Sequence, residues 1–244
     1  MSLWSKHAIL EKNSLILTIG ILIVVAIGGM VEIGPLFYLK STIETVDGVR
    51  PYTPLELAGR DIYVREGCYL CHSQMIRSLR DEVERYGHFS LAAESKYDHP
   101  FQWGSKRTGP DLARIGAKYS DDWHRGHLNN PRSVVPGSVM PRYAFLANSP
   151  LDYRHIRENM KVLRIEGVPY SDEMIAKADD DIKAQLSPDD PSVTDLVARY
   201  PKAVAHTSLG GATTPTEQDA LVSYLQMLGT TVDFKLFDEK ANWR

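Results

Sequence analysis

Residues 65–75 read REGCYLCHSQM and contain the only two cysteines of the 244-residue chain, Cys68 and Cys71, with His72 directly after the second. A structural zinc site needs four ligands, usually from two such pairs, and the chain has no second pair of cysteines. A thioredoxin-like redox motif is disfavoured because no strand pattern precedes Cys68. The spacing C-x-x-C-H is the attachment signature of c-type haem, in which the two thiols bind the haem vinyl groups and the histidine becomes the proximal iron ligand. The sequence therefore predicts one covalently bound haem c, the alternative being an accidental CxxCH.

Met140 is the predicted second axial ligand. It lies in NPRSVVPGSVMPRY (130–143), where three prolines predict a stiff extended loop without a regular element. Met75 is too near the attachment turn to reach the opposite haem face, and the other methionines have apolar, helix-like contexts that favour a core role: Met160, Met174 and Met227. The rival ligands are His124 and His127, although a histidine pair at this spacing also suits a polar helix face. The remaining histidine candidates are His88, His99, His155 and His206.

A partner for the proximal histidine is also predicted. A ligating imidazole usually donates its free N–H to an acceptor, and a proline carbonyl is well suited to accept it. The stretch RTGPDLARIG (107–116) offers Pro110 directly after Gly109. The alternative is an ordinary Gly-Pro turn.

A long apolar run, LILTIGILIVVAIGGMVEIGPLFYL (15–39), contains Glu32 as its only charged residue. At about 1.5 Å per residue, a helix of this length crosses a hydrocarbon core of roughly 30 Å. A cleavable signal peptide would have a shorter apolar region and a small-x-small cleavage site, which is missing here. The sequence therefore predicts one uncleaved helix through the lipid bilayer, at 13–39.

Charges flanking this helix do not fix its orientation, but the predicted cofactor does. In bacteria, covalent haem attachment takes place outside the cytoplasm, so we expect a cell (inner) membrane protein with a cytoplasmic N-terminus and a periplasmic haem domain. No disulfide is expected, because haem uses both thiols. The predicted organisation is a cytoplasmic N-terminus (1–12), the membrane helix (13–39), a linker (40–54), the cytochrome domain (55–230) and a tail (231–244).

The fold class is predicted from two amphipathic segments. PLELAGRDIYVREGC (54–68) has apolar residues at helical spacing after Thr53, so the haem motif closes a helix. TPTEQDALVSYLQMLGT (214–230) begins at a cap, Thr214 or Thr216, and has Gly229 as its stop signal. We expect a mainly α protein, with one N-terminal transmembrane helix and an α-helical, class I-like cytochrome c domain with long loops.

Residues 166–215 are predicted to form two short acidic helices split by LSPDDP (186–191). Their charges are most simply a solvated face, and a docking patch for a basic electron donor is the alternative.

The net charge is −3, and the chain has no repeat, phosphate loop, catalytic triad or basic patch, so no nucleic-acid partner is expected.

Several long motifs resemble one family. They are YTPLELAGRDIYVREGCYLCHSQMIR (52–77), RYGHFS (85–90), YDHPFQWGSKRTGPDLARIGAKYSDDWHRGHL (97–128) and NPRSVVPGSVMPRY (130–143). Together with the membrane helix, they are similar to the mono-haem cytochrome c subunit, CcoO or FixO, of cbb3-type cytochrome c oxidases. The resemblance runs from about residue 8 to 163 and resumes at the C-terminal helix. Residues 166–215 match less sharply and are interpreted as an insertion.

This resemblance implies an electron-transfer subunit that does not itself reduce oxygen. Such a subunit receives electrons from a di-haem cytochrome c subunit or a soluble cytochrome c. It passes them to haem b of the catalytic haem-copper subunit, which also holds haem b3 and copper B. By similarity, Cys68 and Cys71 carry the thioether bonds, and His72 and Met140 are the axial ligands.

The resemblance also implies a calcium ion at the interface with the catalytic subunit, to which WGSKRTGPDL (103–112) contributes, with Ser105 as the expected ligand.

Two other functional classes stay open. One is a stand-alone, membrane-anchored cytochrome c that shuttles electrons. The other is a haem sensor or peroxidase-like enzyme, which needs an open coordination position on the iron.

Overall fold

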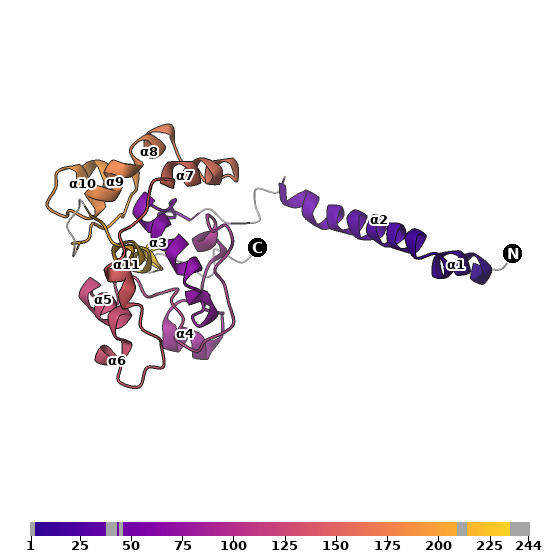
Figure 1. The fold of residues 1–244 in the computed structure, drawn as a ribbon, viewed down its shortest axis with the longest axis horizontal. Helices are drawn as coiled ribbons and strands as arrows, with labels where there is room; N and C mark the ends of the chain where they lie inside the picture. The colour runs from indigo at the N-terminus through magenta and orange to yellow at the C-terminus, as the bar shows by residue number, and fades with distance from the viewer. Residues whose placement is uncertain (1–2, 38–42, 44–45, 209–213, 235–244) are drawn as a thin grey trace. The chain divides into compact units, whose positions relative to one another are not determined.

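The computed structural model describes residues 3–37, 43, 46–208 and 214–234, and these divide into two units at residues 44 and 45 (Figure 1). The remaining residues lie outside this description. They include the last two residues of the predicted membrane helix (38–39), residues 40–42, 44 and 45 of the predicted linker, residues 209–213, and residues 235–244 of the predicted tail. Each unit is described separately.

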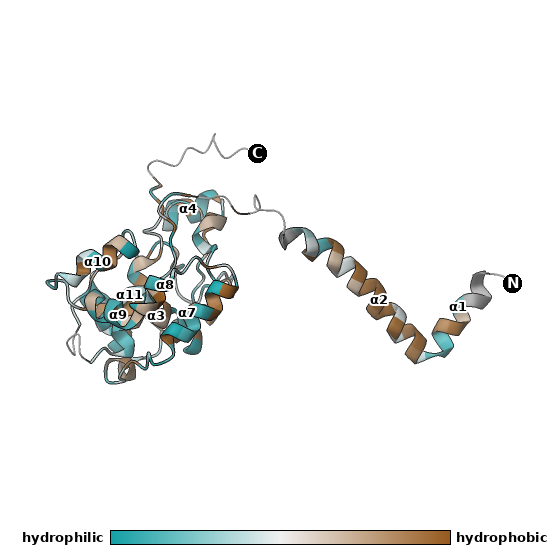
Figure 2. Ribbon diagram, turned by 90° about the horizontal axis from the view of Figure 1, so that it is seen from above, coloured by the Kyte–Doolittle hydropathy of each residue, from teal (hydrophilic) through white to brown (hydrophobic). Residues whose placement is uncertain are grey.

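The first unit contains the predicted membrane helix. Helix α1 (Leu3–Lys12) is followed by α2 (Ser14–Ile33), whose first turn is capped by Asn13 through its side-chain oxygen, 3.3 Å from the Ile16 nitrogen. Helix α2 has 20 residues, and its mostly hydrophobic composition is visible in Figure 2. Its most apolar stretch has a mean hydropathy of 2.6, and none of that stretch is buried within the protein. A helix of this length spans about 30 Å, so α2 is a candidate transmembrane helix. It is shorter than the predicted 13–39, because the chain changes to a 3₁₀ turn at Gly34–Phe37, which contains Pro35.

The second unit is helical, and the part of the chain that the structure describes contains no strand, only one isolated bridge between Pro150 and Thr216. The prediction of a mainly α fold is confirmed. Its α-helices are α3 (Pro54–Arg65), α4 (Arg80–Tyr86), α5 (Asp121–Asn129), α6 (Pro131–Val134), α7 (Ile156–Ile165), α8 (Asp172–Ala176), α9 (Ala178–Gln185), α10 (Ser192–Arg199) and α11 (Glu217–Met227). Its 3₁₀ turns are η2 (Cys68–Leu70), η3 (Ala92–Ser95) and η4 (Ala144–Ala147).

Helices α3 and α11 form the most extensive helix pair of this unit (Figure 1). Each begins with a capping box: Thr53 with Glu56 at α3, and Thr216, not Thr214, with Asp219 at α11. Such a box satisfies backbone N–H groups at the helix start, so the sequence sets both starts locally. Helix α9 packs against α3 and α5 packs against α11, which puts the pair at the centre of the hydrophobic core.

Gly59 allows α3 and α11 to approach closely. A Cβ atom at Gly59 would lie 1.9 Å from the Ala220 carbonyl oxygen and 2.8 Å from the Tyr224 Cβ. We expect Gly59→Ala to destabilise the domain by about 3 kcal/mol, the upper end of the cost of overpacking, because the helix backbone cannot yield like a side chain. Thermal unfolding followed by circular dichroism measures this.

Gly126→Ala in α5 is the matched control. Its Cβ would meet Val134 Cγ1 at 3.7 Å, an ordinary contact, and alanine is favoured over glycine within a helix. A Gly59→Ala variant that unfolds at or above the wild-type temperature would show that the two helices do not meet at this position.

The acidic segment 166–215 differs from its prediction. The first expected helix is broken at Lys177 into α8 and α9, so the segment holds three helices. The interpretation of its charges as a solvated face is wrong for Asp181, whose carboxylate is fully buried and paired with Arg199. Burial of a carboxylate requires such a partner, and a pattern of charges does not reveal it.

Gln185 ties this segment to the helix pair. Its Oε1 accepts a hydrogen bond from Thr53 Oγ1 at 2.6 Å, and its Nε2 donates to Ser223 Oγ at 3.1 Å. Gln185 is fully buried, and so are Ile182 of α9 and Leu196 of α10. The segment therefore belongs to the core of the domain.

Candidate haem site

The CxxCH motif folds as a tight turn directly after α3. Gly67 has φ +69°, a left-handed conformation that glycine adopts without strain, and it redirects the chain into η2. The backbone nitrogens of Cys71 and His72 both donate to the Cys68 carbonyl oxygen, at 3.1 and 3.0 Å. Both thiols are free, and the histidine lies on the same turn. These are the three groups that covalent haem attachment requires.

The thiols do not have the environment of a redox pair. Cys68 is partly buried against the hydrophobic core, and this burial, with a contribution from Glu66, raises the pKa of its thiol to about 12. A reactive cysteine instead has a lowered pKa, because the thiolate is the nucleophile. Cys71 is exposed. The raised pKa of Cys68 therefore argues against a reactive dithiol redox pair.

His72 is held from one side of its ring. Its Nδ1 lies 2.8 Å from the Pro110 carbonyl oxygen, 38 residues further along the chain. Because a carbonyl oxygen only accepts, Nδ1 is the donor, and in a neutral imidazole Nε2 then keeps its lone pair. A neutral imidazole in this tautomer is prepared to bind a metal through Nε2. The contact expected between His72 and Pro110 is present, while the axial role of His72 stays a prediction.

Gly109 contacts the face of the same ring. A Cβ atom there would lie 2.2 Å from His72 Cε1 and 2.7 Å from His72 Nδ1. We expect Gly109→Ala to displace the imidazole and to lower covalent haem yield several-fold, as measured by the pyridine haemochrome content per chain. Gly104→Ala is the control, because its Cβ would meet only the Tyr69 carbonyl oxygen at 3.9 Å. Equal haem content in both variants would contradict this role of Gly109.

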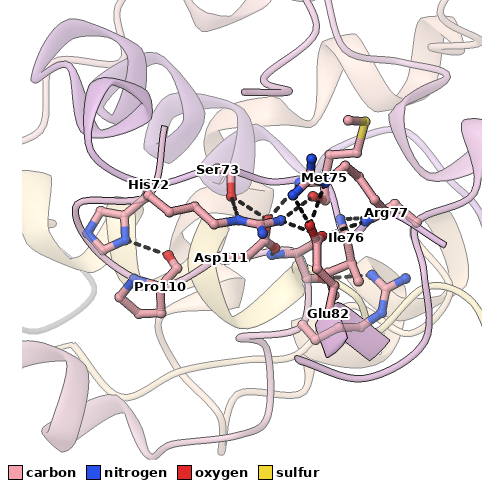
Figure 3. A network of polar contacts seen from close by, with 12 residues as sticks. His72, Ser73, Met75, Ile76, Arg77, Glu82, Pro110 and Asp111 are labelled. Carbon is pink, nitrogen blue, oxygen red and sulfur yellow. Dashed lines mark hydrogen bonds and ion pairs between the residues drawn. The ribbon is translucent and has the colours of Figure 1, made fainter. Parts of the chain in front are cut away.

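The segment 71–73 lies beside the segment 109–112, and Figure 3 shows His72 and Ser73 of the first next to Pro110 and Asp111 of the second. Gly109 N donates to the Cys71 carbonyl at 2.9 Å, and Leu112 N donates to the Ser73 carbonyl at 2.8 Å. Asp111 lies between these two contacts, and its side chain has no exposed surface. No sequence motif pairs Asp111 with the charged residues around it, because their partners come from three different stretches of the chain.

The loop that carries Met140 lies on the same side of the domain as the thiols. Met140, Tyr143 and Cys68 are all partly buried and pack against the hydrophobic core cluster. The pKa of Tyr143 is raised by burial and then by the neighbouring thiols of Cys68 and Cys71. The loop is anchored to α5 by the bond from Tyr143 N to the Leu128 carbonyl, 2.8 Å long. The axial role of Met140 stays a prediction.

The expected loop conformation holds around Met140 itself but not at its start. Residues 138–143 have no regular structure, whereas Pro131–Val134 form the one-turn helix α6. Pro131 occupies the first position of this helix, where the missing N–H of proline costs nothing. Met160, one of the other methionines, is fully buried in the core, as predicted.

The two histidines of α5 have different surroundings. The polar-face alternative is wrong for His124, which is only 4% exposed and whose pKa burial lowers to about 4. The pKa of His127 is lowered first by burial and then by the charge of His72, so these two imidazoles are neighbours. His206 is paired with Asp121 at 2.9 Å. His127 is therefore the histidine to test against Met140.

The expected calcium ligand, Ser105, is exposed in an irregular segment. Within the described residues, no group of three or more His, Cys, Asp or Glu side chains could hold a metal ion.

A surface cavity of about 270 Å³ lies next to Pro110 and is lined by charged side chains, among them Glu82, Arg85 and Arg107. Pockets that enclose a drug-sized ligand measure about 300–1,000 Å³ and are mostly apolar. A cavity of this size with a charged lining does not suit a porphyrin.

The residues present fit a covalently bound haem. Two free thiols and an imidazole with a free Nε2 lie on one turn, and the Met140 loop is beside them. An all-helical domain whose first helix closes on such a turn defines the class of small haem-binding electron-transfer domains.

The model of the family "Cytochrome C oxidase, mono-heme subunit/FixO" matches residues 7–232. The chain belongs to this family, and it has one candidate transmembrane helix. No match was found among curated proteins.

Proposed function

We propose that this chain is the electron-transfer subunit of a cbb3-type cytochrome c oxidase and relays electrons through one covalent haem c. The family establishes an oxidase subunit with a haem. The observation that carries the finer proposal is the donation from His72 Nδ1 to the Pro110 carbonyl at 2.8 Å, beside two free thiols. This arrangement leaves Nε2 of His72 for the iron.

Bound haem supplies a one-electron couple between ferric and ferrous iron. Cys68 and Cys71 would hold the group through two thioether bonds, and His72 would bind it through Nε2 while Pro110 keeps the Nδ1 proton in place. Met140 would provide a thioether as the second ligand. With both ligands supplied by side chains, no substrate would reach the metal, so the chain would conduct electrons and perform no oxygen chemistry.

The proposed donors are a di-haem cytochrome c subunit or a soluble cytochrome c, and the proposed acceptor is haem b of the catalytic haem-copper subunit. Helix α2 anchors the chain in the bacterial inner membrane, with α1 cytoplasmic and the haem domain periplasmic. Ser105 would contribute to a calcium site shared with the catalytic subunit, consistent with its exposure.

Co-purification tests this proposal. A tag placed on the chain, followed by extraction in mild detergent, is expected to bring down haem c together with haem b and copper. A chain that carries haem c without haem b or copper would instead be a stand-alone shuttle. Ready binding of carbon monoxide to its ferrous haem c would indicate an open coordination position, as in a sensor or a peroxidase-like enzyme.

A further inference from the structure

Arg107 links the segment after His72 to the rest of the domain. Its Nε donates to Ser73 Oγ at 2.7 Å, and its Nη2 donates to the Met75 carbonyl oxygen at 2.9 Å and to Glu82 Oε2 at 2.7 Å. Its side chain is only 19% exposed. Three acceptors around one planar guanidinium fix the position of the backbone that follows the histidine.

Asp111 completes the connection on the side of Pro110. Its Oδ2 accepts from Ser73 Oγ at 2.5 Å and from Met75 N at 3.0 Å, while its Oδ1 accepts from Ala113 N at 2.8 Å. Because Asp111 directly follows Pro110, these bonds hold the peptide whose carbonyl faces His72. Arg107 Nη2 also lies 3.4 Å from Asp111 Oδ2. The network shown in Figure 3 thus joins both partners of the His72–Pro110 hydrogen bond.

Glu82 of α4 neutralises the guanidinium. Its side chain is 3% exposed, and it also accepts from the backbone nitrogen of Arg77 at 2.9 Å. The hydrogen bond from Arg107 lowers the pKa of Glu82 to about 2, so this carboxylate keeps its charge at neutral pH. The guanidinium of Arg77, which is more exposed, also pairs with Glu82. Two buried carboxylates, Arg107 and the outer Arg77 therefore lie close to the segment that follows His72.

Stability alone does not account for such a cluster. Buried ion pairs are often no more stabilising than apolar side chains of the same volume, because removing charges from water is costly. Their directional bonds do fix geometry, and the partners of a ligating histidine tune its donation to the metal.

We infer that Arg107 is a positioning residue: through Ser73, Met75 and Asp111 it fixes the Pro110 carbonyl against His72 and so sets the reduction potential of the haem. This inference rests on the proposed role of His72 as an axial ligand. A firm hydrogen bond at Nδ1 makes the imidazole a better electron donor, which stabilises ferric iron and lowers the potential.

Arg107→Lys tests the inference, because lysine keeps the charge and loses the planar fork. The full chain is produced with cytochrome c maturation machinery and studied in mild detergent. We expect the haem c content to stay unchanged and the midpoint potential to rise. We also expect the ferric low-spin resonance spectrum to broaden, because the ring of His72 is no longer held in one orientation. An unchanged or lower potential would overturn the inference.

Arg60→Lys is the matched control. Arg60 is also buried, and it donates to Asp98 Oδ1 at 3.0 Å and to the Pro100 carbonyl oxygen at 2.7 Å. None of the contacts described for it reaches 71–76 or 107–113. We expect Arg60→Lys to lower the unfolding temperature and to leave the potential unchanged. Equal shifts of potential in both variants would mean that any buried substitution moves it, which contradicts a positioning role.

Ser73→Ala provides a second route if Arg107→Lys does not accumulate. It removes one acceptor of Arg107 and one donor to Asp111, so a smaller rise of potential is expected, and no change would overturn the inference.

Failure of the proposed function would appear in the wild type, as a chain without covalent haem. A wild type that carries haem c, with an unchanged potential in the variants, would contradict this inference alone.

Discussion

Replacing Cys68 and Cys71 together by serine is expected to leave the chain without covalently bound haem. Serine has nearly the shape of cysteine, but its hydroxyl does not form thioether bonds to the haem vinyl groups. These are the only cysteines of the chain, so no other residue can substitute for them. Haem staining after denaturing electrophoresis, together with the intact mass, measures the loss.

The single variants serve as controls for this experiment. Each keeps one thioether position, so we expect haem staining to persist at reduced yield. Cys68→Ser should lower the yield more, because Cys68 packs against the core whereas Cys71 is exposed. Covalent haem in the double variant would contradict the proposed attachment and, with it, the proposed function.

Replacing Met140 by alanine is expected to abolish the weak long-wavelength band of ferric, methionine-ligated haem completely. The reduction potential should fall as well, because a thioether ligand raises the potential. The vacated position should then bind carbon monoxide in the ferrous state. Optical spectra of the oxidised and reduced chain, with a potentiometric titration, measure all three effects.

His127→Ala and His124→Ala are the controls for this assignment. His127 is a neighbour of His72, whereas His124 is buried near Asp121 and His206. Both variants should retain the band. A wild type without the band, whose low-spin spectrum changes in His127→Ala but not in Met140→Ala, would make His127 the ligand.

Local signals predicted much of the fold. The start of α3 follows from Thr53, and the start of α11 was narrowed to Thr214 or Thr216, of which Thr216 forms the cap. Both capping boxes involve only the next three residues. The continuous apolar composition predicted the candidate membrane helix but not the residue at which it ends. The chain changes to a 3₁₀ turn at Gly34, and this change leaves the apolar pattern intact. Such features depend on neighbours within about one helical turn and can be read from the sequence.

The candidate site was predicted in part. The CxxCH motif named three of its groups, and the need of an imidazole for an acceptor suggested Pro110. The cluster of Arg107, Glu82 and Asp111 was missed, because nothing in their spacing marks them as partners.

The sequence by itself determined the composition of the membrane helix, the starts of the paired helices and the chemical groups of the CxxCH turn. Only the tertiary structure decided that His124 and Asp181 are buried, that Gln185 joins α9 to Thr53, and that Arg107 holds the residues behind His72. The physical reason is the distance along the chain over which each effect acts. Capping, periodicity and hydropathy act between residues close in sequence, whereas burial and buried polar pairing depend on how the loops bring distant segments together.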